Sequence, residues 1–88
     1  MMLKKVVFVR DNEELHEKVT AIQKGWTYKQ VEQHFGAKAY QKTEEKNKTK
    51  YYWRIEVETA SAEYEKIKIY LGEFENDRLV FGALLPNG

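Results

Sequence analysis

The sequence predicts an α+β domain: an antiparallel β-sheet, made of an N-terminal strand and a C-terminal three-stranded meander, with one or two helices packed on one face. Two observations support this fold class. Strand-like apolar patterns occupy both ends of the chain, and two capped segments with helical spacing lie between them. A chain of 88 residues has room for one hydrophobic core, so we expect a single domain over residues 1–88.

Residues 3–10 predict the first strand. They are rich in β-branched and aromatic residues, and the apolar residues Val6 to Val9 are consecutive. A strand without polar alternation is typical of a position that is covered on both faces. We therefore expect this strand to be central in its sheet.

Residues 12–24 predict a helix. Asp11 can cap the first turn, and Gly25 can end the last one. Apolar residues recur at helical spacing between these two positions. They are Leu15, Val19 and Ile22.

Residues 28–35 predict a second, shorter helix. Thr27 is a good capping residue, Gln30 stands at the reciprocal position of a capping box, and Gly36 can end the helix. An irregular strand is the alternative for this segment. The polar, lysine-rich residues 37–50 that follow predict either a hairpin arm or a loop.

From Tyr51 to Val57 apolar and polar residues alternate, which predicts a half-buried strand with Trp53 and Ile55 inside. Its outward residues would include Tyr52 and Arg54.

Residues 66–74 predict the next strand, with Ile67, Ile69 and Leu71 on its inward side. A helix through residues 64–74 is the competing interpretation, but Gly72 and the spacing of the isoleucines favour the strand. Asn76-Asp77 is a good tight-turn pair, and residues 79–85 would close the hairpin.

The composition excludes several classes of protein. Without cysteine the chain has no disulfide framework and no thiolate metal site, which fits a cytoplasmic protein. The longest apolar run, Leu79 to Leu85, is far shorter than the roughly 20 residues that cross a membrane. The formal net charge of +1 is smaller than the basic excess that a dedicated DNA-binding protein usually has. Residues 38–54 nevertheless hold six bases and two acids, a local net charge of +4 that would suit a basic patch.

Candidate catalytic residues are few. The single serine, Ser61, lies in an expected turn without a nucleophile motif, and both aspartates have capping or turn roles. Glu13 and His16 have helical i, i+3 spacing and His34 lies on the next helix, but one such pair is a weak metal signal. The sequence predicts no catalytic, cofactor or metal site, and no small-molecule ligand.

Residues 20–38 resemble the helix-turn-helix motif of DNA-binding proteins, with a glycine turn, a threonine cap and a short helix ending at phenylalanine-glycine. The resemblance implies a recognition helix after Gly36. The sequence departs from the motif at Glu32, where a small residue is typical, and Ala37-Lys38 offers no cap. Two packed, capped helices explain the same residues without DNA.

The sheet face opposite the core is the best candidate for binding. If the strand register permits, it groups aromatic and cationic side chains that suit a protein contact. The candidate contact residues are Tyr52, Arg54, Lys68, Tyr70 and Phe74. The sequence therefore predicts a non-enzymatic binding domain whose partner is another protein or a second copy of itself.

Nucleic-acid binding is the alternative. Rings and cations on an open sheet can stack bases and contact phosphates, and the adjacent turn adds Lys46, Lys48 and Lys50. A solvated turn accounts for the same lysines, and Glu56 and Glu58 on this face would repel phosphate.

Overall fold

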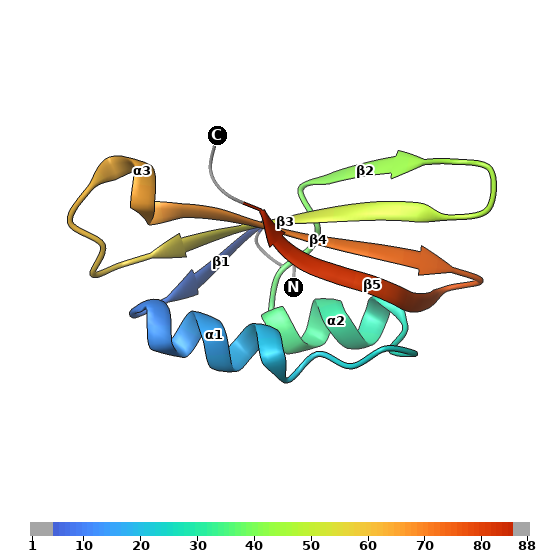
Figure 1. Ribbon diagram of the computed structural model, residues 1–88, viewed down its shortest axis with the longest axis horizontal. Helices are drawn as coiled ribbons and strands as arrows, with labels where there is room; N and C mark the ends of the chain where they lie inside the picture. Colours follow the sequence, from blue (N-terminus) through green and yellow to red (C-terminus); the bar gives the residue numbers. More distant parts are fainter. Residues whose placement is uncertain (1–4, 86–88) are drawn as a thin grey trace.

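The structure, a computed structural model, describes residues 5–85, apart from the side chains at positions 63 and 64. It has the expected α+β architecture, with helices α1 and α2 together on one side of a twisted sheet (Figure 1). The elements in chain order are β1 (Val6–Val9), α1 (Asn12–Thr20), α2 (Tyr28–Phe35), β2 (Gln41–Glu44), β3 (Thr49–Val57), α3 (Glu63–Lys66), β4 (Ile67–Glu75) and β5 (Arg78–Leu85).

The sheet has five strands, and β3, β4 and β5 form the expected antiparallel meander. The other edge of β3 is shared by two short strands. Parallel β1 pairs with residues 54–57, and antiparallel β2 pairs with residues 49–52. The expectation of a central first strand is therefore wrong. β1 lies at the end of the strand order, and because α1 and α2 lie on one side of the sheet, Val7 and Val9 on that side are buried while Phe8 on the other face is 49% exposed.

Helix α1 begins as predicted, with the Asp11 side chain accepting a hydrogen bond from the Glu14 N–H at 2.9 Å. It ends at Thr20, four residues earlier than expected. The chain leaves the helix because its next segment pairs with β5. The Gly25 N–H donates to the Leu79 carbonyl, and the Leu79 N–H donates to the Trp26 carbonyl, both at 2.8 Å.

Helix α2 settles the choice between helix and strand for residues 28–35. Both halves of the capping box between Thr27 and Gln30 form, and Gly36 ends the helix in the left-handed conformation at φ 69°. Residues 37–50 likewise resolve into a hairpin arm, β2, and a turn. In the last hairpin Asn76 and Asp77 both have positive φ, as a two-residue type I′ turn requires.

The orientation of β3 is the one predicted. Trp53 and Ile55 are fully buried, and the Trp53 Nε1–H donates to the Ala37 carbonyl at 2.9 Å. Around the indole lie the rings of Tyr28, Phe35, Tyr51 and Tyr70. This aromatic cluster joins α2 to the middle of the sheet.

The orientation of β4 is opposite to the prediction. Antiparallel register places Tyr70 directly opposite Trp53, and opposed residues share a face, so Tyr70 points toward the helices. Phe74 lies on the same side, and these two rings are only 3% and 2% exposed. Gly72 between them leaves the space that the neighbouring rings and Leu79 fill. Ile67, Ile69 and Leu71 consequently lie on the other face.

Close packing at Gly82 generates a stability prediction. A Cβ built at Gly82 would collide with the hydroxyl of Tyr70, which crosses from the neighbouring strand. Gly82→Ala should therefore lower the free energy of unfolding by about 1–3 kcal/mol, the usual range for overpacking. Tyr70→Phe removes the hydroxyl oxygen, which is the atom nearest to the new Cβ. The double variant should therefore lose less stability than the sum of the losses in the two single variants.

Urea unfolding of the four proteins measures this coupling. Strictly additive losses would show that Tyr70 does not lie over Gly82.

Candidate functional site

The side of the sheet away from α1 and α2 is the main candidate site, and we call it the open face. Along β3 it presents a polar stripe, whose members at alternate positions are Lys50, Tyr52, Arg54 and Glu56. On β4 and β5 it presents an apolar stripe. The members of this apolar stripe are Ile67, Ile69, Leu71, Phe81, Ala83 and Leu85.

Only two of the five predicted contact residues lie on this face. Tyr52 is half-buried beside the ring of Tyr40, and the exposed Arg54 guanidinium lies 3.8 Å from the Glu56 carboxylate. Tyr70 and Phe74 are core residues, so their predicted contact with a partner is wrong. Lys68 lies opposite Ile55 on the helix side, where it lines a hollow near α1.

The apolar stripe is the feature that sequence reasoning missed. Ile67, Ile69 and Leu71 are half-buried but belong neither to the core nor to the hydrophobic side chains packed on it, within the part of the chain that the structure describes. Phe81 is 48% exposed at the end of the stripe that lies next to the β4–β5 turn. One signal was present in the sequence. Tyr70, Gly72 and Phe74 form an aromatic–glycine–aromatic set that competes with the aliphatic set for the core.

Ion pairs occupy two of the three lysines that were candidates for phosphate binding. The Lys48 ammonium lies 3.2 Å from the Glu73 carboxylate, and the Lys50 ammonium lies 3.0 Å from that of Glu45. Lys46 is exposed in the same turn. Because carboxylates neutralise this cluster, the structure adds no support to the predicted nucleic-acid surface.

The recognition helix that the helix-turn-helix resemblance implies after Gly36 is absent from the described residues. After Gly36 the chain does not form a recognition helix but runs through Ala37 into β2. Ala37 is fully buried and its carbonyl holds the Trp53 indole, so this segment belongs to the core.

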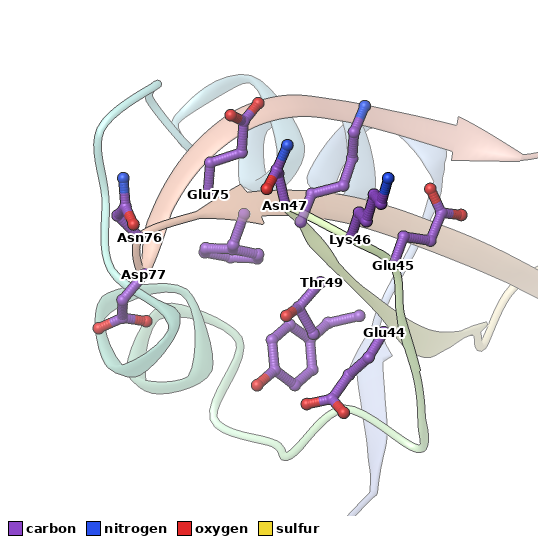
Figure 2. A pocket seen from close by; sticks show the side chains of 11 residues that line it. Glu44, Glu45, Lys46, Asn47, Thr49, Glu75, Asn76 and Asp77 are labelled. Carbon is purple, nitrogen blue, oxygen red and sulfur yellow. The ribbon is translucent and has the colours of Figure 1, made fainter.

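A hollow of about 610 Å³ lies between the tips of the β2–β3 and β4–β5 hairpins (Figure 2). Tyr51 and Phe74 line its inner part, and its rim is polar. The polar rim residues are Glu44, Glu45, Lys46, Asn47, Lys48, Thr49, Glu75, Asn76 and Asp77. Four carboxylates and two ammonium groups lie around this open rim together with amide and hydroxyl side chains, so the hollow offers charges of both signs.

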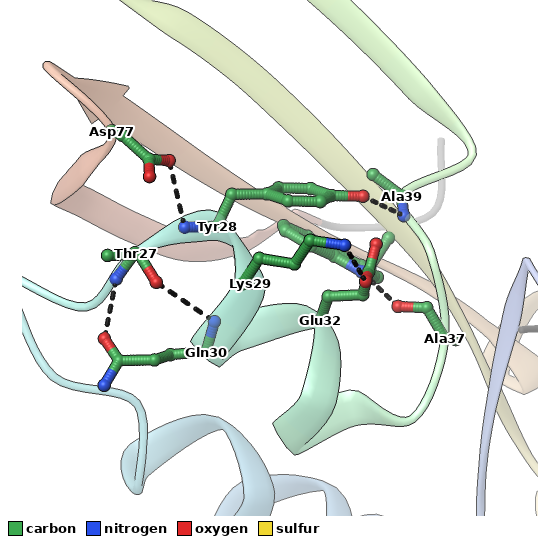
Figure 3. A network of polar contacts seen from close by, with 9 residues as sticks. Thr27, Tyr28, Lys29, Gln30, Glu32, Ala37, Ala39 and Asp77 are labelled. Carbon is green, nitrogen blue, oxygen red and sulfur yellow. Dashed lines mark hydrogen bonds and ion pairs between the residues drawn. The ribbon is translucent and has the colours of Figure 1, made fainter.

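Among the side chains that the structure describes, Glu32 is the one charged side chain that is buried. Its carboxylate lies 3.6 Å from the Lys29 ammonium and close to Tyr28, whose hydroxyl accepts a hydrogen bond from the Ala39 N–H at 3.3 Å (Figure 3). Burial raises the pKa of Tyr28 to about 12, and the Glu32 carboxylate adds to the rise. No local sequence pattern separates Glu32 from an exposed helical glutamate.

The two histidines have separate surroundings. The Nε2–H of His34 donates to the Lys18 carbonyl at 2.7 Å, and its ring meets Trp26 edge-on, so His34 ties α2 to α1. Exposed His16 lines the same hollow as Lys68, of about 420 Å³. Among residues 5–85 no group of histidine and carboxylate side chains is arranged to hold a metal ion.

The chain matches no protein-family model, no curated protein and no solved structure with which it was compared. In the described part of the chain, the helices are too short or too polar to cross a membrane.

The raised pKa of Tyr28 predicts a loss of stability in alkali. The unfolded chain releases this proton near pH 10 and the folded chain at about pH 12, so the free energy of unfolding should fall across that window. Tyr28→Phe removes the proton, and the variant should show a shallower fall. In this variant buried Tyr70, whose pKa is also raised by burial, should still contribute its own part of the fall in stability.

Thermal unfolding at pH 8, 10 and 11.5 measures both slopes. Equal slopes for the wild type and Tyr28→Phe would contradict the part-buried position of the Tyr28 hydroxyl beside Glu32.

Proposed function

We propose that the protein is a small binding domain that acts through a protein contact on the open face rather than through catalysis. The apolar stripe supports this most directly. Three aliphatic residues of a central strand, Ile67, Ile69 and Leu71, face away from helices α1 and α2. A contiguous apolar surface that the fold leaves partly exposed in this way marks interaction sites in monomeric domains.

The charges on the open face favour a protein over a nucleic acid. Arg54 is balanced by Glu56 and Lys48 by Glu73, so the face offers apolar contact with paired charges beside it. Protein interfaces commonly have this composition, whereas phosphate binding depends on an excess of cations over anions. The absence of cysteine fits action in the cytoplasm.

Site-specific photo-cross-linking in cells tests the proposal. With benzoylphenylalanine in place of Tyr52, irradiation should give a protein adduct of discrete mass. Placed at the exposed Lys29 of α2, the same group should give none.

Leu71→Asp should suppress the Tyr52 adduct, because it puts a charge in the middle of the apolar stripe. Leu84→Asp is the matched control, since Leu84 is an exposed leucine of the same sheet on the opposite face. Equal adducts from Tyr52 and Lys29, or equal effects of the two aspartates, would overturn the protein-contact surface. A nuclease-sensitive adduct would replace it with nucleic-acid binding.

A further inference from the structure

Along β3 and β4 the open face has two neighbouring stripes of different chemistry. β3 contributes the polar stripe, which in chain order is Lys50, Tyr52, Arg54 and Glu56. Beside it β4 contributes the aliphatic residues Ile67, Ile69 and Leu71. A partner that covers these two strands must therefore present an apolar strip alongside a polar one.

We propose that this partner is a second copy of the chain, stacked face to face about a two-fold axis that crosses the strands. This inference rests on the proposed function and names its partner. Such an axis lays each stripe on its own counterpart, so the β4 side chains pack against those of the second copy. An axis along the strands would instead set the charged stripe on the aliphatic one. Two-fold interfaces have to be self-complementary in this way.

The order of side chains along β3 supplies the charge complementarity. In chain order these side chains are a cation, an aromatic ring, a cation and an anion. The two-fold axis reverses this order in the second copy, so the first side chain faces the fourth and the second faces the third. Lys50 then faces Glu56 of the second copy, and Arg54 faces the ring of Tyr52, each pair occurring twice. Leu71 faces Ile69 in the same register.

The existing ion pairs do not prevent this arrangement. Lys50 pairs with Glu45, and Arg54 with Glu56, through side chains that are partly exposed. Exposed pairs of this kind contribute little to stability, so exchanging them for contacts across the interface costs little. The same register places Glu73 over Ile67 of the second copy, where Glu73 keeps its own partner in Lys48.

The face is large enough for a weak to moderate dimer. β3 and β4 are nine residues long, β5 is eight, and β1 and β2 together occupy the fourth strand position, so spacings of about 3.4 Å and 4.8 Å give a footprint of roughly 600 Å² per copy. Two such footprints reach about 1,200 Å², the lower limit for specific interfaces. Stacked sheets of this type pack with their strands about 30° apart.

Charge reversal at Lys50 and Glu56 tests the register. Sedimentation velocity of the full chain should show a wild-type dimer whose dissociation constant rises about tenfold or more in Lys50→Glu and in Glu56→Lys, because each variant opposes like charges twice. The double variant should return to within about threefold of the wild type. Lys42→Glu, on the opposite side of β2, should leave the dissociation constant unchanged.

Mixing the two single variants gives the sharpest result. One copy then has two acids where the other has two bases, so the mixture should form a heterodimer more tightly than either variant alone associates. Unfolding midpoints of each variant show whether the fold is retained.

The outcomes test separately whether the open face is the interface and whether the proposed side-chain register across it is right. If Leu71→Asp dissociates the dimer but the charge variants and their mixture have no effect, the open face is the interface and this register is wrong. A wild-type chain that stays monomeric at about 1 mM, well above the dissociation constants of specific complexes, overturns the second copy as partner. In that case a Tyr52 adduct with a different protein would leave the proposed function standing.

Discussion

The buried indole of Trp53 determines which side chains of this domain meet solvent. It lies in the middle of the central strand, donates a hydrogen bond to the Ala37 carbonyl and packs among the rings of Tyr28, Phe35 and Tyr70. A shift of β3 by one residue would expose this ring and bury Arg54 instead. Removing such a ring costs about 3–5 kcal/mol, a large part of the stability of a small domain. The inward orientation of Trp53 therefore fixes Tyr52 and Arg54 on the outside.

Strand pairing transmits this orientation across the sheet. Trp53 opposes Tyr70, so β4 turns its aromatic side toward the helices and its aliphatic side outward. The helices cover one apolar surface and leave a second one on the other side. This second surface, with polar β3 beside apolar β4, is the basis of the proposed contact and of its self-complementary pattern.

The sequence was sufficient wherever the deciding signal was local. Trp53, Ile55 and Val57 alternate with charged residues, and the caps at Asp11 and Thr27 adjoin the helices that they begin. β4 was different, because both of its sides carry apolar residues and the choice depends on the partner strand and on the space above Gly72. Ion pairs such as Lys48–Glu73 join residues distant in sequence, so the lysines were visible but their neutralisation was not.

Methyl NMR with a soluble gadolinium chelate tests the central claim most directly, since three isoleucines report the two sides of the sheet. At low protein concentration the chelate should broaden the methyl signals of Ile67 and Ile69 and spare that of fully buried Ile55. At concentrations where the chain associates, Ile67 and Ile69 should become protected. Broadening of Ile55 as strong as that of Ile69 at low concentration would contradict the inward orientation of β3 and the open face that follows from it.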